Sequence, residues 1–177
     1  MHLHHLIRSS TLALGLSFLA ACSTLHTTPK TALDKQASWV LVPAINNTET
    51  PQAGARLDSI TASLLRSHGI QNLTYVGASE NNDSLFDLAD RRQQTATLAA
   101  AKNTGAKYAV AASVDEWRYK VGLDGEPAAG ITLNIIEVQS GQVVWSGAAA
   151  KTGWSREAVS AVAQKVVNNL LNSAVAP

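Results

Sequence analysis

Short apolar runs and amphipathic stretches alternate along the chain after residue 36. Trp39–Pro43 is an apolar run that ends at a proline, which predicts a short buried strand. Apolar residues then recur at helical spacing from Leu57 to Leu65, and Gly69 ends this pattern, which predicts an amphipathic helix. Asn72–Val76 is predicted to be a second strand.

Polar side chains are predicted to cap the helices. Thr50, which precedes a proline, fits the start of the first helix. Asp90 and Gln93 have the spacing of a capping box and predict the start of a second helix, which Gly105 ends. Ser155 is predicted to cap a last helix, in which apolar residues recur over three turns. We therefore expect three helices, each with a polar side chain at its start.

The second half of the chain has the pattern of three strands joined by short turns. Residues 108–121 form a long run whose later positions alternate, and residues 131–138 and 142–148 follow. Gln139–Gly141 is a tight turn in which the glycine can adopt a positive φ. These strands are predicted to form an antiparallel meander before the last helix.

The predicted elements fit one domain. The chain has 177 residues, of which 46% are hydrophobic, and this is enough to build a single core. The order β-α-β-α-β-β-β-α predicts one α/β domain over residues 37–177. We expect a mixed sheet of about five strands with three helices on its faces.

The first 21 residues have the pattern of a lipoprotein signal peptide. Arg8 gives a positive start, and the apolar stretch of about ten residues after it is shorter than the roughly 20 that span a bilayer. Leu19–Cys22 resembles the bacterial lipobox, and Cys22 is the only cysteine of the chain. We therefore predict a signal peptide over residues 1–21 and lipid attachment at Cys22. The alternative is a chance cysteine beside a conventional cleavage site, which would leave an unpaired thiol in an oxidising compartment.

The segment after the signal peptide is predicted to be a tether. Residues 22–36 are polar and lack a sustained period, which is typical of a short linker between a lipid and a domain. Ser23 follows the cysteine, where lipoproteins kept in the inner membrane typically carry aspartate. By resemblance to sorted lipoproteins, the expected location is the periplasmic face of the outer membrane.

Composition and charge exclude several classes of function. The chain carries 14 Lys and Arg against 13 Asp and Glu, so it lacks the charge excess of a nucleic-acid-binding protein. Only His26 and His68 follow the predicted leader, and no zinc, phosphate-loop or Gly-x-Ser-x-Gly motif occurs. The sequence therefore predicts no enzyme, no metal site and no cofactor.

Four acidic residues are candidates for a charged site. Asp115 and Glu116 lie on the predicted long strand, and Asp124 and Glu126 lie in the turn after it. Two carboxylates could act in glycoside hydrolysis, but neighbouring strand residues face opposite sides, so Asp115 and Glu116 are not expected to share one site. The same acids could be a solvated strand and turn. Repeated in an oligomer, they could instead form a ring of negative potential for a cationic ligand.

Aromatic residues suggest contact surfaces. Trp117, Arg118 and Tyr119 suit a subunit interface or sugar stacking, or the two aromatic rings could simply cover the core. Trp154 lies in a predicted loop before the last helix, next to basic residues. Such a tryptophan suits contact with a membrane surface or a partner, and its alternative is a hydrophobic staple that packs on the helix.

Several segments together resemble the PelC family, the outer-membrane lipoproteins of Pel exopolysaccharide export. The resemblance covers the lipobox and essentially the entire mature domain. It implies an α/β fold related to curli-secretion lipoproteins and to periplasmic lipoprotein activators. The segments that carry it are Thr48–Pro51, Asp83–Phe86, Glu116–Gly122, Asp124–Pro127, Gly153–Glu157 and Ser160–Lys165.

The resemblance implies a partner set and a mechanism. The family members form a ring of identical subunits, a dodecamer in known examples, on the inner leaflet of the outer membrane beneath the porin and scaffold PelB. An acidic mouth of the ring would attract a cationic, partly deacetylated polysaccharide and pass it to the porin. Carried over to this chain, Cys22 is the lipid acceptor and Trp154 the membrane-facing aromatic. Asp115, Glu116, Asp124 and Glu126 are the candidates for the acidic mouth.

A second hypothesis is a lipoprotein that regulates a periplasmic cell-wall enzyme. Activators of similar fold must reach across the periplasm, which favours a long disordered linker. Residues 22–36 form a short segment, so the sequence favours the membrane-proximal ring.

Overall fold

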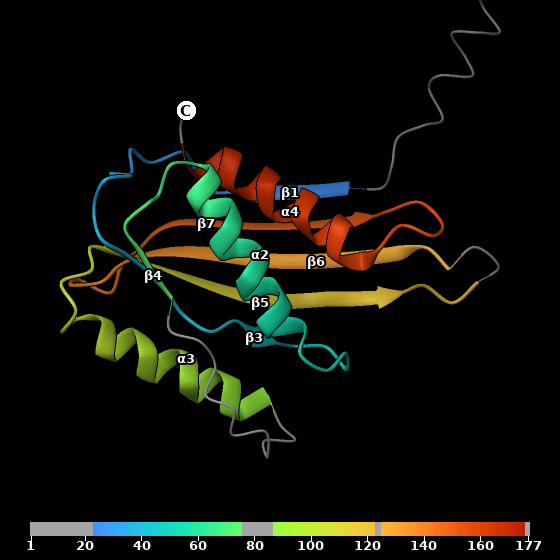
Figure 1. Cartoon of the computed structure of the whole chain (residues 1–177), viewed down its shortest axis with the longest axis horizontal. Helices are drawn as coiled ribbons and strands as arrows, with labels where there is room; N and C mark the ends of the chain where they lie inside the picture. The colour runs from blue at the N-terminus through green and yellow to red at the C-terminus, as the bar shows by residue number, and fades with distance from the viewer. Residues whose placement is uncertain (1–22, 76–86, 123–124, 176–177) are drawn as a thin grey trace, which may run out of the picture.

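A seven-stranded mixed sheet forms the centre of the molecule, as the computed structural model shows for its described residues, 23–75, 87–122 and 125–175 (Figure 1). Its antiparallel part joins β1, β7, β6 and β5, while β2 and β3 pair with β5 in parallel and β4 pairs with β2 in parallel. The strands are β1 (Ser23–Thr27), β2 (Trp39–Leu41), β3 (Ile45–Asn46), β4 (Leu73–Tyr75), β5 (Tyr108–Tyr119), β6 (Pro127–Glu137) and β7 (Val143–Thr152).

The predicted fold class is confirmed, and the sheet is two strands larger than expected. The additional strands are β1 and β3, which flank the first predicted strand in the sequence. β1 occupies part of the segment that we expected to be a tether, and it pairs along β7 from Ser23 opposite Lys151 to Thr27 opposite Gly147. All five residues of β1 are exposed, so backbone pairing rather than an apolar pattern holds the strand.

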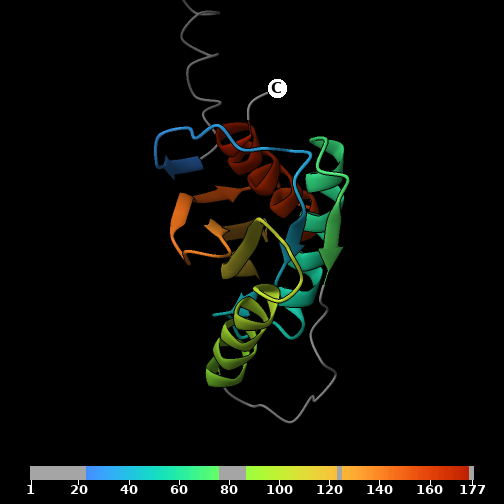
Figure 2. The same ribbon diagram turned by 90° about the vertical axis from the view of Figure 1, so that its left-hand side faces the viewer.

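Two helices cover one face of the sheet. α2 (Ala53–Ser67) and α4 (Val159–Ala174) pack against each other and against the sheet. Figure 2 shows both helices on the same side of the strands. The core under them contains large side chains that are at most 1% exposed, including Trp39, Leu133 and Trp145. We call this side the closed face.

The opposite face is covered only in part. α3 (Asp87–Ala101) packs there against β3 and β5, over a small cluster that includes Val40 and Ala109. Among the described helices, none lies over β6, β7 and β1 on this side (Figure 2). We call this uncovered part the open face. On β6 and β7 its side chains are small and uncharged: Thr132, Asn134, Ser146, Ala148 and Ala150. Thr24 and His26 of β1 pair with Ala150 and Ala148 and lie on the same face.

The three predicted helix caps are wrong. The Thr50 hydroxyl donates a hydrogen bond to the carbonyl oxygen of Trp117 instead, at 2.5 Å. α3 begins three residues before Asp90, whose carboxylate accepts a hydrogen bond from the backbone N–H of Asn46 at 3.1 Å. α4 begins four residues after Ser155 and has no side-chain cap. The first two polar groups therefore join helices or loops to neighbouring strands, a tertiary role that local sequence patterns do not reveal.

Candidate functional site

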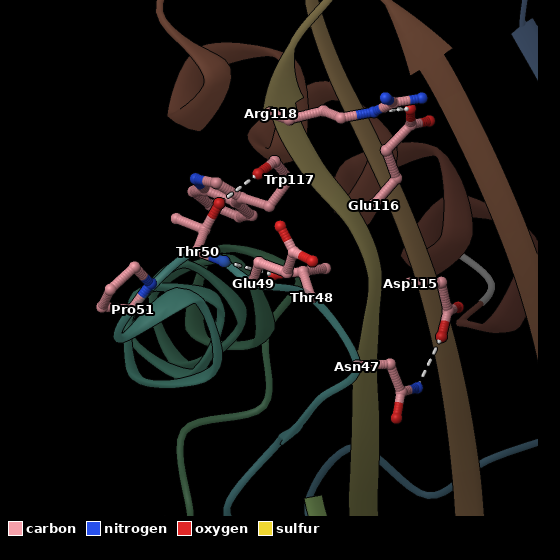
Figure 3. Close-up of a pocket in the computed structure, with 9 residues that line it drawn as sticks. All are labelled: Asn47, Thr48, Glu49, Thr50, Pro51, Asp115, Glu116, Trp117 and Arg118. Carbon is pink, nitrogen blue, oxygen red and sulfur yellow. Dashed lines mark hydrogen bonds and ion pairs between the residues drawn. The ribbon is translucent and has the colours of Figure 1, made fainter. Parts of the chain in front are cut away.

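A β-bulge in β5 determines where its acidic residues point. Val114 pairs with Ile131 of β6 and Glu116 with Gly130, so Asp115 is an extra residue between them. Both Val114 and Trp117 are buried on the closed face, although they are three positions apart. Asp115 and Glu116 both lie on the other side (Figure 3). The expectation that these two acids face opposite sides is therefore wrong, because the bulge breaks the alternation.

The two acids line one groove of about 810 Å³, between the segment Asn47–Pro51 and residues Asp115–Arg118 of β5 (Figure 3). A third carboxylate, that of Glu49, lines the same groove. Sequence reasoning missed Glu49 as a charged-site residue, since it lies in a loop before α2 and only the tertiary structure brings it to the strand.

Hydrogen bonds hold the Asp115 carboxylate in one orientation. Oδ1 accepts from the Asn47 side-chain amide at 3.0 Å and from the Ser113 hydroxyl at 2.9 Å. Oδ2 accepts from the Thr132 hydroxyl at 2.7 Å. Because Thr132 belongs to the open face, Asp115 lies where the groove meets that face.

The groove is negative overall. Arg118 forms an ion pair with Glu116, with its Nε 2.8 Å from Oε1. The Arg118 side chain is 65% exposed and the Glu116 side chain 31%, so solvent screens this pair and it contributes little to stability, but it offsets one of the three acidic charges. Arg91 also lies beside the groove, where its guanidinium donates to the side-chain oxygen of Asn47 at 3.0 Å, so the excess of acidic over basic charge there is one. This excess gives a local negative potential in a concave surface, which focuses the field.

The other residues predicted for a site do not form a single cluster with the acids of the groove. Glu126 is exposed at the start of β6, outside the groove, and Asp124 lies outside the described residues, as does Cys22. Trp117 is 4% exposed and belongs to the hydrophobic core. Tyr119 is 54% exposed, so of the two aromatic rings proposed for a contact surface only this one is accessible.

A second surface, the aromatic end, contains Tyr119, Val121 and Trp154. All three are exposed, Trp154 by 71%, so it is not packed as a staple. β5 and β7 both end here (Figure 1), and the Lys120 ammonium donates to the Thr152 hydroxyl at 2.7 Å between them. Because the first residue of β1, Ser23, pairs with Lys151, the chain enters the sheet at this same end.

One ion pair and one backbone hydrogen bond shape the loop that carries Trp154. The backbone N–H of Trp154 donates to the Glu157 carboxylate at 3.3 Å, and Lys165 of α4 pairs with the same carboxylate. The Lys165 ammonium lowers the pKa of Glu157. The loop is therefore held against α4 while the indole ring points away from the core.

One buried acid lies elsewhere. Asp58 of α2 is 1% exposed and accepts hydrogen bonds from the backbone N–H of Ala44 at 3.0 Å and from the Tyr75 hydroxyl at 3.2 Å. The pKa of Asp58 is raised to about 7, mainly because the carboxyl is buried; the hydrogen bonds from Ala44 and Tyr75 lower the pKa, and the negative charge of Asp90 adds to the rise. This group titrates in a range that few carboxyls reach, and sequence reasoning did not single it out.

Two further properties concern the described part of the chain. No helix in it is long and apolar enough to cross a bilayer. No group of three or more His, Cys, Asp or Glu side chains there is arranged to hold a metal ion.

Comparison with known proteins shows the family. A family model described as "Peptidoglycan-synthase activator LpoB" matches residues 25–150. A solved PelC dodecamer from Paraburkholderia phytofirmans is 35% identical, with a TM-score of 0.72, and the match covers 86% of this chain and 99% of that chain. The chain belongs to the family of PelC and LpoB lipoproteins.

Two further solved structures are similar to this chain. A single-residue variant of the same PelC, in another crystal form, is 34% identical with a TM-score of 0.70, over 85% of this chain and 97% of that one. The lipoprotein GNA1162 from Neisseria meningitidis is 17% identical with a TM-score of 0.54, over 77% and 96% of the two chains, and shows the fold alone. A search of curated proteins finds no match. The resemblance to PelC inferred from sequence segments is confirmed.

Proposed function

We propose that this protein is a non-catalytic lipoprotein of Pel polysaccharide export. It is anchored through Cys22 to the periplasmic face of the outer membrane and forms a ring of identical subunits. The ring lies beneath the PelB porin and scaffold and guides a cationic exopolysaccharide towards it. The observation that carries the proposal is the 35% identity to a PelC dodecamer over 99% of that chain.

The aromatic end supports the membrane-proximal position. A lipidated Cys22 would directly precede Ser23, which is already part of the sheet opposite Lys151. A lipid at Cys22 would therefore hold the aromatic end against the bilayer. An exposed tryptophan and tyrosine next to lysines suit the membrane–water interface, where amphipathic aromatic rings gather.

The groove supports the guiding role. Glu49, Asp115 and Glu116 give each subunit a concave negative surface, and a ring would repeat it around its axis. A polymer with free amino groups would be concentrated there by the field, while weak individual contacts would let it move on. Glu126 and Asp124 stay candidates for the same role at the turn before β6.

Complementation of a strain that lacks this protein tests the proposal. The wild-type chain should restore polymer secretion, measured with a polymer-specific lectin. Cys22→Ser should release the protein from membranes and abolish most of the secretion. The Glu49→Gln/Glu116→Gln double variant should reduce secretion severalfold at normal protein level and normal membrane attachment. Glu137→Gln, which removes an acid at the opposite end of β6, is the matched control and should secrete normally.

Two results would contradict the proposal. Full secretion by the Cys22→Ser variant would show that export does not need a lipid at Cys22. Equal loss in the groove variant and the Glu137→Gln control would show a general charge effect rather than guidance by the groove.

A second candidate function is regulation of a periplasmic cell-wall enzyme. The match of residues 25–150 to the LpoB family model favours it. Against it, β1 begins directly after Cys22, which leaves no long linker to reach across the periplasm. Adding the purified protein to a peptidoglycan synthase separates the two: faster glycan polymerisation would support the regulator, and no change is expected for the export lipoprotein.

A further inference from the structure

The outward surface of α3 is unusually suited to close contact. Gln94, Leu98 and Ala101 face the sheet, and the residues on the opposite side of the helix are all exposed. These residues follow one another at intervals of four and three positions, so they form one stripe along the helix. The stripe consists of Arg92, Ala96 and Ala99. Its two alanines would let another backbone approach closely.

The open face is the natural counterpart of this stripe. A sheet of an α/β domain is normally covered on both faces, yet β6, β7 and β1 lack a helix on this side within the described chain. The open face has no charged side chain of its own on β6 and β7. Charged side chains of β5 border it: Asp115 is bonded to Thr132, Glu116 lies beside Gly130, and Lys120 is bonded to Thr152 near the end of β7. The central part of a protein interface is depleted of charge in the same way.

The two surfaces lie at the same level along the strands. Asp90 of α3 accepts a hydrogen bond from Asn46, which pairs with Val114 of β5. One turn later, the Gln94 amide donates to the carbonyl oxygen of Ala112. From Asp90 to Gln94 the helix rises about 6 Å, and from Val114 to Ala112 the strand covers about the same distance. Because the residue numbers rise along α3 while they fall along β5, α3 runs alongside β5 in the opposite direction.

This correspondence places each part of the stripe opposite a row of the sheet. Ala96 is level with Ala111 of β5, which pairs with Asn134, which in turn pairs with Ser146. Arg92 lies one turn nearer to Asp115. In a ring seated on a membrane by its aromatic end, the strands run along the ring axis. Rotation about that axis then keeps every residue at its own level.

We propose that the open face is covered by α3 of the next subunit. The Arg92–Ala99 stripe of one copy packs on Asn134, Ser146 and Ala148 of its neighbour, with Arg92 beside the neighbour's Asp115 carboxylate. Each copy thus receives one α3 and gives one, and the contact is heterologous, as ring closure requires. This inference rests on the proposed ring. It assigns Asp115 to the subunit contact and leaves Glu49 and Glu116 to face the polymer.

Disulfide cross-linking in the full-length membrane-bound protein tests the contact. Ala96→Cys and Ser146→Cys are combined in one chain, and each single variant is the control. Mild oxidation of the double variant should give a ladder of covalent dimers, trimers and larger species under denaturing conditions, because every copy carries both halves of the contact. Each single variant should stay largely monomeric under the same oxidation.

The outcomes separate this inference from the proposed function. A native mass that shows a ring, together with no ladder, overturns the α3 contact and leaves the ring intact. Efficient dimers of Ala96→Cys alone would show a symmetric α3–α3 contact and also overturn it. A monomeric native mass at all concentrations overturns both.

A charge reversal gives a second readout. Arg92→Glu should raise the protein concentration needed for ring formation by about tenfold or more, because it places two like charges together. Arg56→Glu, which reverses an exposed charge on α2, should leave that concentration unchanged. Equal effects of the two reversals would contradict a specific role of Arg92.

Discussion

The two faces of the sheet carry different kinds of side chains. The closed face under α2 and α4 holds Trp39, Leu133 and Trp145, each at most 1% exposed. The open face holds small residues, both polar and alanine, along β6 and β7 and borders the acidic groove, with Asp115 between them. Burying large apolar side chains accounts for most of the stability of a domain, whereas exposed polar positions contribute little. The difference suggests that stability depends on one face, and that contacts and charge can change on the other.

The largest difference in stability is expected between variants of two neighbouring residues at the bulge, one on each face. Trp117→Ala removes a 4%-exposed indole from the closed face and should lower the free energy of unfolding by about 3–5 kcal/mol. Glu116→Gln, one residue away on the other face, should change it by less than about 1 kcal/mol. Urea denaturation followed by circular dichroism measures both. Similar losses for the two variants would contradict the division between the faces.

Asp58 is the exception inside the helix-covered layer, and its effect should depend on pH. The folded-state pKa of about 7 lies above the ordinary value of 3.8, so the folded protein takes up the proton first as the pH falls. The carboxyl therefore stabilises the fold fully below about pH 4, and this contribution is lost as the pH rises through 7.

The Asp58→Asn variant tests this sign. Asparagine can accept from Ala44 and donate to the Tyr75 oxygen without a buried charge. As the pH rises from 5 to 8, the free energy of unfolding of the variant should increase relative to that of the wild type, by on the order of 2–4 kcal/mol. Thermal unfolding of both chains across this range measures the difference. A difference independent of pH would contradict the raised pKa.

A methyl group at Gly130 tests the bulge with a smaller expected effect. A Cβ there would lie 3.2 Å from the Glu116 Cβ and 3.3 Å from its backbone nitrogen. Gly130→Ala should therefore destabilise the protein by about 1–2 kcal/mol through overpacking. The Gly122→Ala control meets nothing within 4 Å, and chemical denaturation should show almost no change for it. Equal effects would mean that Glu116 does not approach β6 as described.

The smallest effect on stability is expected at the aromatic end. Trp154→Ala removes an exposed ring and should change the free energy of unfolding by less than about 0.5 kcal/mol. The soluble domain carrying this change should bind phospholipid vesicles several times more weakly than the unaltered domain, as measured by vesicle sedimentation. A large loss of thermal stability would show that the indole packs on the protein.

The sequence predicts those elements that bury an apolar pattern. The run at Trp39 and the meander from residue 108 to the end of β7 follow from periodicity, and the structure confirms them. β1 could not be predicted in this way, because all its residues are exposed and it is held by backbone pairing. The same reason explains the wrong caps: Thr50 and Asp90 bond to distant strands, which local spacing cannot show.

The site depends on an irregularity. A strict period of two places Asp115 and Glu116 on opposite sides, and nothing in the residues around them indicates the extra residue of the bulge. Once the bulge is present, both acids meet Glu49 in one groove. Glu49 itself could have been found only through its position in the segment Thr48–Pro51, which resembles PelC.

The mass of the purified native protein tests the central claim most directly. Native mass spectrometry of the detergent-solubilised lipoprotein should show a closed oligomer, with twelve copies as in the PelC relatives. A single copy at every concentration would contradict the ring, and with it both the guiding groove and the contact between α3 and the open face.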